Sequence, residues 1–247
     1  MALEIRIMNL GDVELDWGFL VWGHELGKRV VVPSYAYLIL GAEKPILVDT
    51  GYRNPDVMQR LGMVGIQKEE QKIENQLAKY GLKTDDIGYV IHTHLHIDHA
   101  GQTYKFPNAV AVVQRREMEA AFSGTMGKQY NYEDMEHMFQ RLHSPGSLWL
   151  LDGDKSGPIE VVPGVKCVFA QSHSPGSQFV YVETSEGTAV ICGDTITILT
   201  CKHVIIGNKQ VSTGLPETTI GTKSLKWPQL LAFATTRILS CQLTTMQ

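Results

Sequence analysis

Residues 92–101 read HTHLHIDHAG and hold four metal-competent side chains within six positions. His94 and His96 alternate, so both imidazoles can point the same way where a strand ends. Asp98 and His99 follow on the next turn and can reach a neighbouring position. We therefore predict two adjacent metal sites. Imidazole and carboxylate ligands without a thiolate suit zinc or another borderline first-row metal.

Two later positions can complete these sites. His173 lies in the Pro-Gly turn SHSPGS, residues 172–177, after a predicted strand. Asp194 ends an apolar strand, where a carboxylate can bridge two metals while staying out of the core. Ordinary structural roles are the alternatives: a surface turn for the histidine, and a helix or turn cap for the aspartate.

Short β-type runs alternate with turns and helices along the chain. The runs predict strands at residues 4–10, 29–40, 45–49, 87–91, 109–113, 159–162, 165–170, 178–183 and 188–192. Apolar residues at helical spacing predict helices over residues 65–80, 115–122 and 132–143, and the Met and aromatic stripe of the last is expected to be core. This pattern favours an α/β fold with two packed sheets and helices outside, in a single domain over residues 1–247.

Composition limits the partners that we expect. The chain has 43% hydrophobic residues and a net charge of −4, so nothing in its electrostatics favours nucleic acid or an anionic membrane. No apolar segment approaches the roughly 18 residues that span a bilayer, and residues 1–6 lack a basic stretch that leads into an apolar run. We expect a cytoplasmic protein. Its four cysteines lie far apart in the sequence and form no C-x-x-C pair, a pattern that favours reduced thiols over a disulfide scaffold.

The C-terminal segment differs in composition from the rest of the chain. Residues 197–247 contain five basic residues and one acidic residue, a balance of +4, which leaves −8 for residues 1–196. The segment also has ten threonines, against eight in the preceding 196 residues. Two interpretations stay open: a basic layer that neutralises an acidic body, or a terminus of different origin.

These motifs together resemble the metallo-β-lactamase superfamily. The resemblance rests on HLHIDH at residues 94–99, on LVDTG at residues 47–51, and on His173 and Asp194 in that order. It implies an αββα sandwich with the metals at one edge of the two sheets. The SPGSQ turn that follows His173 and the YAYLIL strand that feeds the Asp-Thr-Gly turn are most similar to the N-acyl-homoserine lactonase group, which opens the lactone ring of quorum-sensing signals.

The resemblance also implies a role for each residue. Its implied metal ligands are His94, His96 and His173 for the first ion, Asp98 and His99 for the second, and Asp194 as the bridge. Asp49 would orient the ligand loop. Two divalent ions, most simply zinc, would supply a bridging hydroxide that attacks a small-molecule lactone, with Asp98 as the catalytic residue that passes the proton to the leaving oxygen. A homodimer is plausible for such a lactonase.

The C-terminal segment departs from the lactonase pattern. That group supplies one more histidine to the second metal, and a tyrosine three residues after the bridging aspartate. Here position 197 is Thr, and the only histidine after Asp194 is His203. We therefore predict a weak second metal site. Two alternatives stay open: a thioester hydrolase of the glyoxalase II type, which shares the histidine motif, and a catalytically weakened metal-binding domain.

Overall fold

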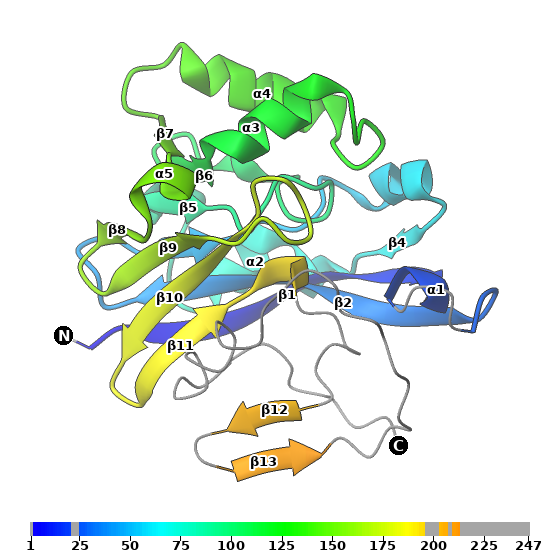
Figure 1. Cartoon of the computed structure of the whole chain (residues 1–247), viewed down its shortest axis with the longest axis horizontal. Coiled ribbons are helices and arrows are strands. Elements are labelled where there is room, and N and C mark those ends of the chain that lie inside the picture. The colour runs from blue at the N-terminus through cyan, green and yellow to red at the C-terminus, as the bar shows by residue number, and fades with distance from the viewer. Residues whose placement is uncertain (1, 21–24, 196–202, 207–208, 213–247) are drawn as a thin grey trace.

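The computed structural model describes residues 2–20 and 25–195, together with the backbone of residues 203–206 and 209–212. Its centre consists of two β-sheets, one of seven strands and one of four (Figure 1). A separate hairpin pairs β12 (His203–Ile206) with β13 (Lys209–Ser212). None of the helices in this described part has the length and apolarity needed to span a bilayer.

The larger sheet combines antiparallel and parallel pairing. Its strands, in spatial order, are β4 (Val64–Ile66), β1 (Glu4–Asp16), β2 (Arg29–Leu40), β3 (Ile46–Val48), β5 (Tyr89–Ile91), β6 (Val110–Gln114) and β7 (Leu148–Leu151). β1 and β2 form a long antiparallel pair, whereas β3, β5, β6 and β7 are parallel. The carboxyl ends of these four parallel strands therefore meet at one edge, which is where ligands bind in parallel sheets.

The smaller sheet is antiparallel and packs on the larger one. Its strands, in spatial order, are β11 (Gly187–Ile191), β10 (Gln178–Thr184), β9 (Val165–Phe169) and β8 (Ile159–Val162). Between the sheets lies an apolar cluster that includes Val48, Ile91 and Val112 of the larger sheet and Val165 and Val180 of the smaller one. Because side chains alternate along a strand, the neighbouring residues of β3, β5 and β6 face away from this cluster.

Three helices bury those outward-facing residues. They are α2 (Ile73–Ala78), α3 (Arg115–Ser123) and α4 (Tyr132–Leu142), the last two being the green helices of Figure 1. α2 packs against Leu47 and Val90, whereas α3 and α4 pack against Ala111 and Val113. The described residues thus hold three layers of the expected αββα sandwich: one of helices and two of sheet.

Shorter elements connect these layers. They are α1 (Trp17–Leu20), η1 (Pro55–Leu61), η2 (Glu69–Gln71), η3 (Thr84–Asp86), η4 (Thr103–Lys105), α5 (Gly153–Ser156) and η5 (Gly193–Thr195). One side chain ties several of the connections together. The guanidinium of Arg141 in α4 is buried and donates to the carbonyls of Thr103, Phe106, Ala109 and Ser147.

Every strand expected from the sequence is present, but two other expectations were wrong in part. The helix expected over residues 65–80 begins only at Ile73, because residues 64–66 form β4 and pair with β1. The expected core stripe of α4 was Tyr132, Met135, Phe139 and Leu142. Of these only Met135 is buried, and the other three are 71%, 50% and 46% exposed, in the order Tyr132, Phe139 and Leu142. The short strands β4 and β7 were not expected from the sequence.

Candidate metal centre

The HLHIDH loop follows the carboxyl end of β5, and its neighbours fix its path. The amide of Asp49, just after β3, donates to the Ile91 carbonyl at 2.9 Å. The Gly101 amide donates to the Gly51 carbonyl at 2.8 Å, at the far end of the loop. A Cβ at Gly101 would collide with the backbone of the segment after Gly51, so only glycine allows this approach. The loop is therefore held at both ends by the turn that follows β3.

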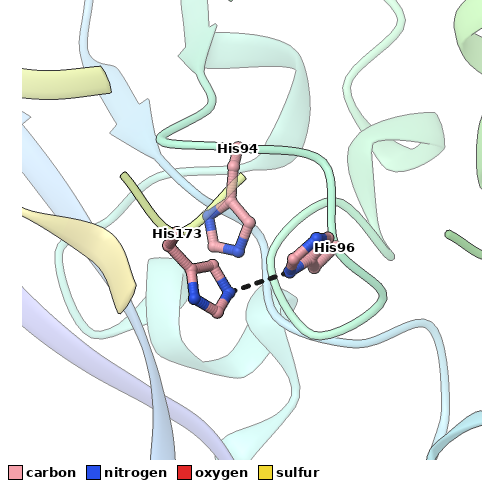
Figure 2. A group of neighbouring side chains, drawn as sticks. All are labelled: His94, His96 and His173. Carbon is pink, nitrogen blue, oxygen red and sulfur yellow. Dashed lines mark hydrogen bonds between the residues drawn. The ribbon is translucent and has the colours of Figure 1, made fainter. Parts of the chain in front are cut away.

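Three imidazoles meet at this edge, as Figure 2 shows. His94 and His96 come from the loop after β5, and His173 comes from the loop between β9 and β10 of the other sheet. Each offers a nitrogen, and these three atoms lie within 4.8 Å of one another. His96 Nδ1 is 3.0 Å from His173 Nε2. Nitrogens bound to one tetrahedral zinc lie about 3.3 Å apart, so the observed spacing suits a shared ion.

A second group overlaps the first. Ligand atoms of His94, His99 and Asp194 also lie within 4.8 Å of one another. Asp194, in η5 just after β11, has Oδ1 at 3.1 Å from His99 Nε2 and Oδ2 at 3.7 Å from His173 Nε2. Its two oxygens therefore face the two groups of imidazoles. Asp98 lies at the margin, with Oδ2 at 3.9 Å from His99 Nε2 and its side chain 29% exposed.

The structure thus gathers five of the six residues singled out in the sequence as ligands into these two groups, and Asp98 lies beside His99. Within the described part of the chain, Nε2 of His94 is buried and lacks a hydrogen-bond partner. A buried polar atom left unpaired costs about 1–3 kcal/mol, a cost that a coordinated cation removes. The residues present therefore fit a divalent metal.

Asp49 orients two of these imidazoles. Its carboxylate is buried and accepts hydrogen bonds from the Thr93 amide at 2.8 Å, the Thr93 hydroxyl at 2.7 Å and His99 Nδ1 at 2.9 Å. Because the Thr93 proton points to Asp49, the hydroxyl oxygen can accept from His94 Nδ1, 3.1 Å away. In their neutral forms both imidazoles then carry their proton on Nδ1 and present the lone pair of Nε2 to the cluster.

The backbone of Asp49 is also unusual, with a φ of 59° in the left-handed region. Aspartate and asparagine adopt this conformation more readily than other residues that have a side chain. The Asp-Thr-Gly turn after β3 thereby bends back toward the HLHIDH loop, and the carboxylate reaches both Thr93 and His99.

Burial and neighbouring charges shift the pKa values of the cluster in opposite directions. Burial lowers the pKa of His96 to about 3, and it lowers the pKa of His94 well below its ordinary value. Burial also opposes the charged form of His99, but the surrounding carboxylates, Asp194 first, raise the pKa of His99 well above its ordinary value. The same pairing outweighs burial at Asp194 and lowers the pKa of that carboxyl. Without metal, the cluster therefore has neutral imidazoles beside a His99–Asp194 ion pair.

Sequence reasoning did not find two buried side chains that hold the ligand loops. Gln178, at the start of β10, donates from its backbone to the Thr93 carbonyl at 2.9 Å and from Nε2 to the His92 carbonyl at 2.7 Å. Glu117, in the first turn of α3, accepts hydrogen bonds from both the HLHIDH loop and the His173 loop. In the sequence, Gln178 stands out only as the last residue of the SPGSQ turn. Glu117 does not stand out at all, because a glutamate is common in an amphipathic helix.

The chain has counterparts among known proteins. The family model described as the metallo-beta-lactamase superfamily matches residues 29–220, a range that includes all six candidate ligands. The chain belongs to this superfamily. An N-acyl homoserine lactonase of Bacillus thuringiensis is 34% identical over 174 residues, 67% of this chain and 64% of that protein. The N-acyl homoserine lactonase AttM of Azorhizobium caulinodans is 28% identical over 162 residues, 64% of this chain and 57% of that protein.

A solved structure agrees with the metallo-β-lactamase assignment. An N-acyl homoserine lactone hydrolase, with the product N-hexanoyl-L-homoserine bound at its catalytic metal center, matches with a TM-score of 0.64 and 30% identity. The match covers 78% of this chain and 76% of that chain. In sequence, by contrast, the chain matches less than two thirds of the length of the two lactonases named above.

The expectations about the C-terminal segment concern residues that the structure describes little or not at all. Thr197, at the place of the expected tyrosine, lies outside the described residues. For His203 only the backbone, in β12, is described. The weak second metal site therefore stays a prediction.

Proposed function

We propose that the chain is a metal-dependent hydrolase that opens the lactone ring of N-acyl-homoserine lactones. One observation carries the proposal: imidazoles and carboxylates from both sheets gather at the carboxyl edge of the parallel strands. The names of the relatives, together with a neighbouring structure that holds an opened lactone, support this substrate class. The donor set of imidazoles and carboxylates supports zinc.

The chain's own residues hold and orient the reacting groups. We assign His94, His96 and His173 to one ion, His99 and Asp98 to a second, and Asp194 to both. Two divalent ions, when bound, would supply an acidified water for attack and a polarised lactone carbonyl. Through its contacts with Thr93 and His99, Asp49 keeps the single proton of neutral His94 and of neutral His99 on Nδ1 and directs both Nε2 atoms into the cluster.

Asp98 is the residue that we assign to proton transfer. Burial raises the pKa of its carboxyl above the ordinary range, against the opposing charge of His99. The side chain is nevertheless 29% exposed, so a substrate can approach it. We infer that Oδ2 takes the proton released when water adds to the carbonyl. It then returns the proton to the ring oxygen as the ring C–O bond breaks. The second proton of the water leaves to solvent, so the product is an N-acyl-homoserine with a free hydroxyl and a carboxylate.

The test combines metal content with turnover in the full chain. Zinc per chain is measured by elemental analysis, and hydrolysis of hexanoyl- and dodecanoyl-homoserine lactone is followed by acid release. A glutathione thioester serves as the competing substrate. We expect lactone turnover that needs zinc and exceeds thioester turnover. Faster thioester hydrolysis would instead favour the glyoxalase II alternative, and stable zinc binding without any turnover would favour a weakened metal-binding domain.

Two alanine variants sharpen the test. His96→Ala removes a candidate ligand and should lower lactone turnover by more than about 100-fold. Loss of a mere hydrogen-bond partner of a metal ligand already costs about 10–100-fold in metal affinity or activity. His143→Ala removes an exposed histidine at the end of α4 and should leave turnover unchanged. Equal turnover in the two variants would rule out the proposed site.

A further inference from the structure

Glu117 is a buried carboxylate that lies between the two ligand loops. It is in the first turn of α3, and its relative exposure is 0%. No basic side chain forms an ion pair with it among the residues that the structure describes. A carboxylate in this position must be stabilised by hydrogen bonds, because an unpaired buried charge is costly.

The hydrogen bonds of Glu117 divide between the loops. Oε1 accepts from the Leu95 amide at 2.9 Å and from the Tyr130 hydroxyl at 3.1 Å. Oε2 accepts from the Ser174 hydroxyl at 2.6 Å and from the Gly176 amide at 3.0 Å. Leu95 lies between two candidate ligands in the sequence, and Ser174 directly follows the third. One carboxylate oxygen therefore serves each loop.

The contacts around Glu117 reinforce this arrangement. The ring of Tyr130, held through its hydroxyl, packs edge-on against the His96 imidazole with centroids 5.2 Å apart. On the other side, a Cβ at Gly176 would collide with the backbone of Glu117, so the His173 loop lies directly against the start of α3. Glu117 therefore holds Tyr130, whose ring packs on His96, and Ser174, which directly follows His173 in the chain.

We propose that Glu117 is the positioning residue of the first metal site. Its carboxylate fixes how far the 94–96 loop lies from the 173–176 loop, and so fixes the geometry in which the three imidazoles meet. This inference rests on the metal site of the proposed function. It assigns no contact with the substrate to Glu117.

Only a carboxylate satisfies both loops. The amides of Leu95 and Gly176 can only donate, and each needs an acceptor at a different oxygen of residue 117. A glutamine has one acceptor oxygen, so in either orientation its NH₂ group would face one of these two amides. The hydroxyls of Tyr130 and Ser174 can rotate to accept, but a backbone amide cannot. Glu117→Gln should therefore displace one loop while leaving the size and shape of the side chain nearly unchanged.

The experiment measures metal binding rather than turnover. Zinc affinity is determined by competition with a chromophoric chelator, and the visible spectrum of the cobalt-loaded protein reports the coordination geometry. Glu117→Gln should bind zinc about 10- to 100-fold more weakly and change the cobalt spectrum, as loss of a ligand's supporting partner does. The outcome that overturns the proposal is a Glu117→Gln protein with wild-type zinc affinity and an unchanged cobalt spectrum.

Asp134→Asn is the matched control. Asp134 is also a buried carboxylate at the start of a helix, and it accepts from Arg53 Nε at 2.7 Å and from Asn131 Nδ2 at 3.1 Å. It contacts neither ligand loop through these bonds. The same carboxylate-to-amide change there should alter thermal unfolding of the metal-free protein but leave zinc affinity within about twofold of wild type. An equal loss of affinity in both variants would mean that Glu117 acts only through general stability.

A double variant keeps the test decisive if Glu117→Gln does not fold. Tyr130→Phe with Ser174→Ala removes one hydrogen bond from each oxygen and leaves both amide contacts in place. We expect zinc affinity about three- to tenfold below wild type, and an unchanged affinity would count against the proposal. Lactone turnover of the wild type is measured separately. Zinc binding that responds to Glu117 without any turnover refutes the lactonase function alone, whereas turnover with zinc binding indifferent to Glu117 refutes only this inference.

Discussion

Asp49→Asn should weaken metal binding by changing which nitrogen of two histidines carries the proton. The left-handed backbone at this position tolerates asparagine as well as aspartate, so the turn itself stays in place. The amide oxygen must face the Thr93 backbone amide, which can only donate. The NH₂ group then faces His99 Nδ1, and this nitrogen has to accept instead of donate. In its neutral, metal-binding form His99 then carries its proton on Nε2, the nitrogen that faces Asp194.

The magnitude follows from the contacts that change. His99 loses the charged partner of a 2.9 Å hydrogen bond, and the Thr93 hydroxyl loses the acceptor that directed its own oxygen toward His94. Loss of such a supporting partner costs about 10–100-fold in metal affinity, or about 1.4–2.7 kcal/mol. We expect the larger loss at the ion held by His99, because that contact is direct.

Stepwise zinc titration against a chelator resolves the affinities for the two ions. The variant Thr93→Val separates the effect of Asp49 on His94 from its effect on His99. This variant removes the hydroxyl link to His94 but leaves the Asp49–His99 contact intact. It should weaken mainly the ion held by His94, His96 and His173. An Asp49→Asn protein that binds both ions within threefold of wild type would refute the reasoning, and so would a Thr93→Val protein that loses mainly the other ion.

Three further predictions concern the scaffold. Gly101→Ala should lower the free energy of unfolding by about 1–3 kcal/mol in urea titrations, since its Cβ would collide with the neighbouring turn. Arg141→Lys should lower it by about 3 kcal/mol in the same assay, since one ammonium cannot reach four buried carbonyls. Burial raises the pKa of Tyr52 to about 12 from 10.0. Its contribution to stability should therefore be complete below about pH 10 and be lost as the pH rises toward 12, and Tyr52→Phe should show a smaller loss of stability between about pH 10 and 12.

The sequence located the candidate ligands because their signal is local. Alternating histidines after a β-branched strand carry their spacing in the chain itself, and β2 had the expected bounds because its β-branched and aromatic run is long and unbroken. Glu117 could not be found in this way. Its burial depends on loops that are 22 and 57 residues distant in the chain, and no periodicity records such contacts.

The errors in the fold have a similar cause. Residues 64–66 read as the start of a helix, but their backbone pairs with β1, and a partner strand outweighs the weak preference of a short segment. In α4 the apolar spacing predicted a buried stripe at Tyr132 and Phe139. The buried face instead includes Met135, Met138 and Arg141, because the guanidinium of Arg141 finds four carbonyl partners inside. Periodicity alone cannot anticipate a buried charge with such partners.

The placement of the candidate ligands on both sheets has a mechanical consequence. His94, His96 and His99 follow a strand of the seven-stranded sheet, whereas His173 and Asp194 follow strands of the four-stranded sheet. An ion held by both sets would act as a non-covalent cross-link, tying together segments about eighty residues apart much as a disulfide does. Loading with metal should then join the two halves of the sandwich into one cooperative unit. Chelation would let the smaller sheet open at a lower temperature than the larger one.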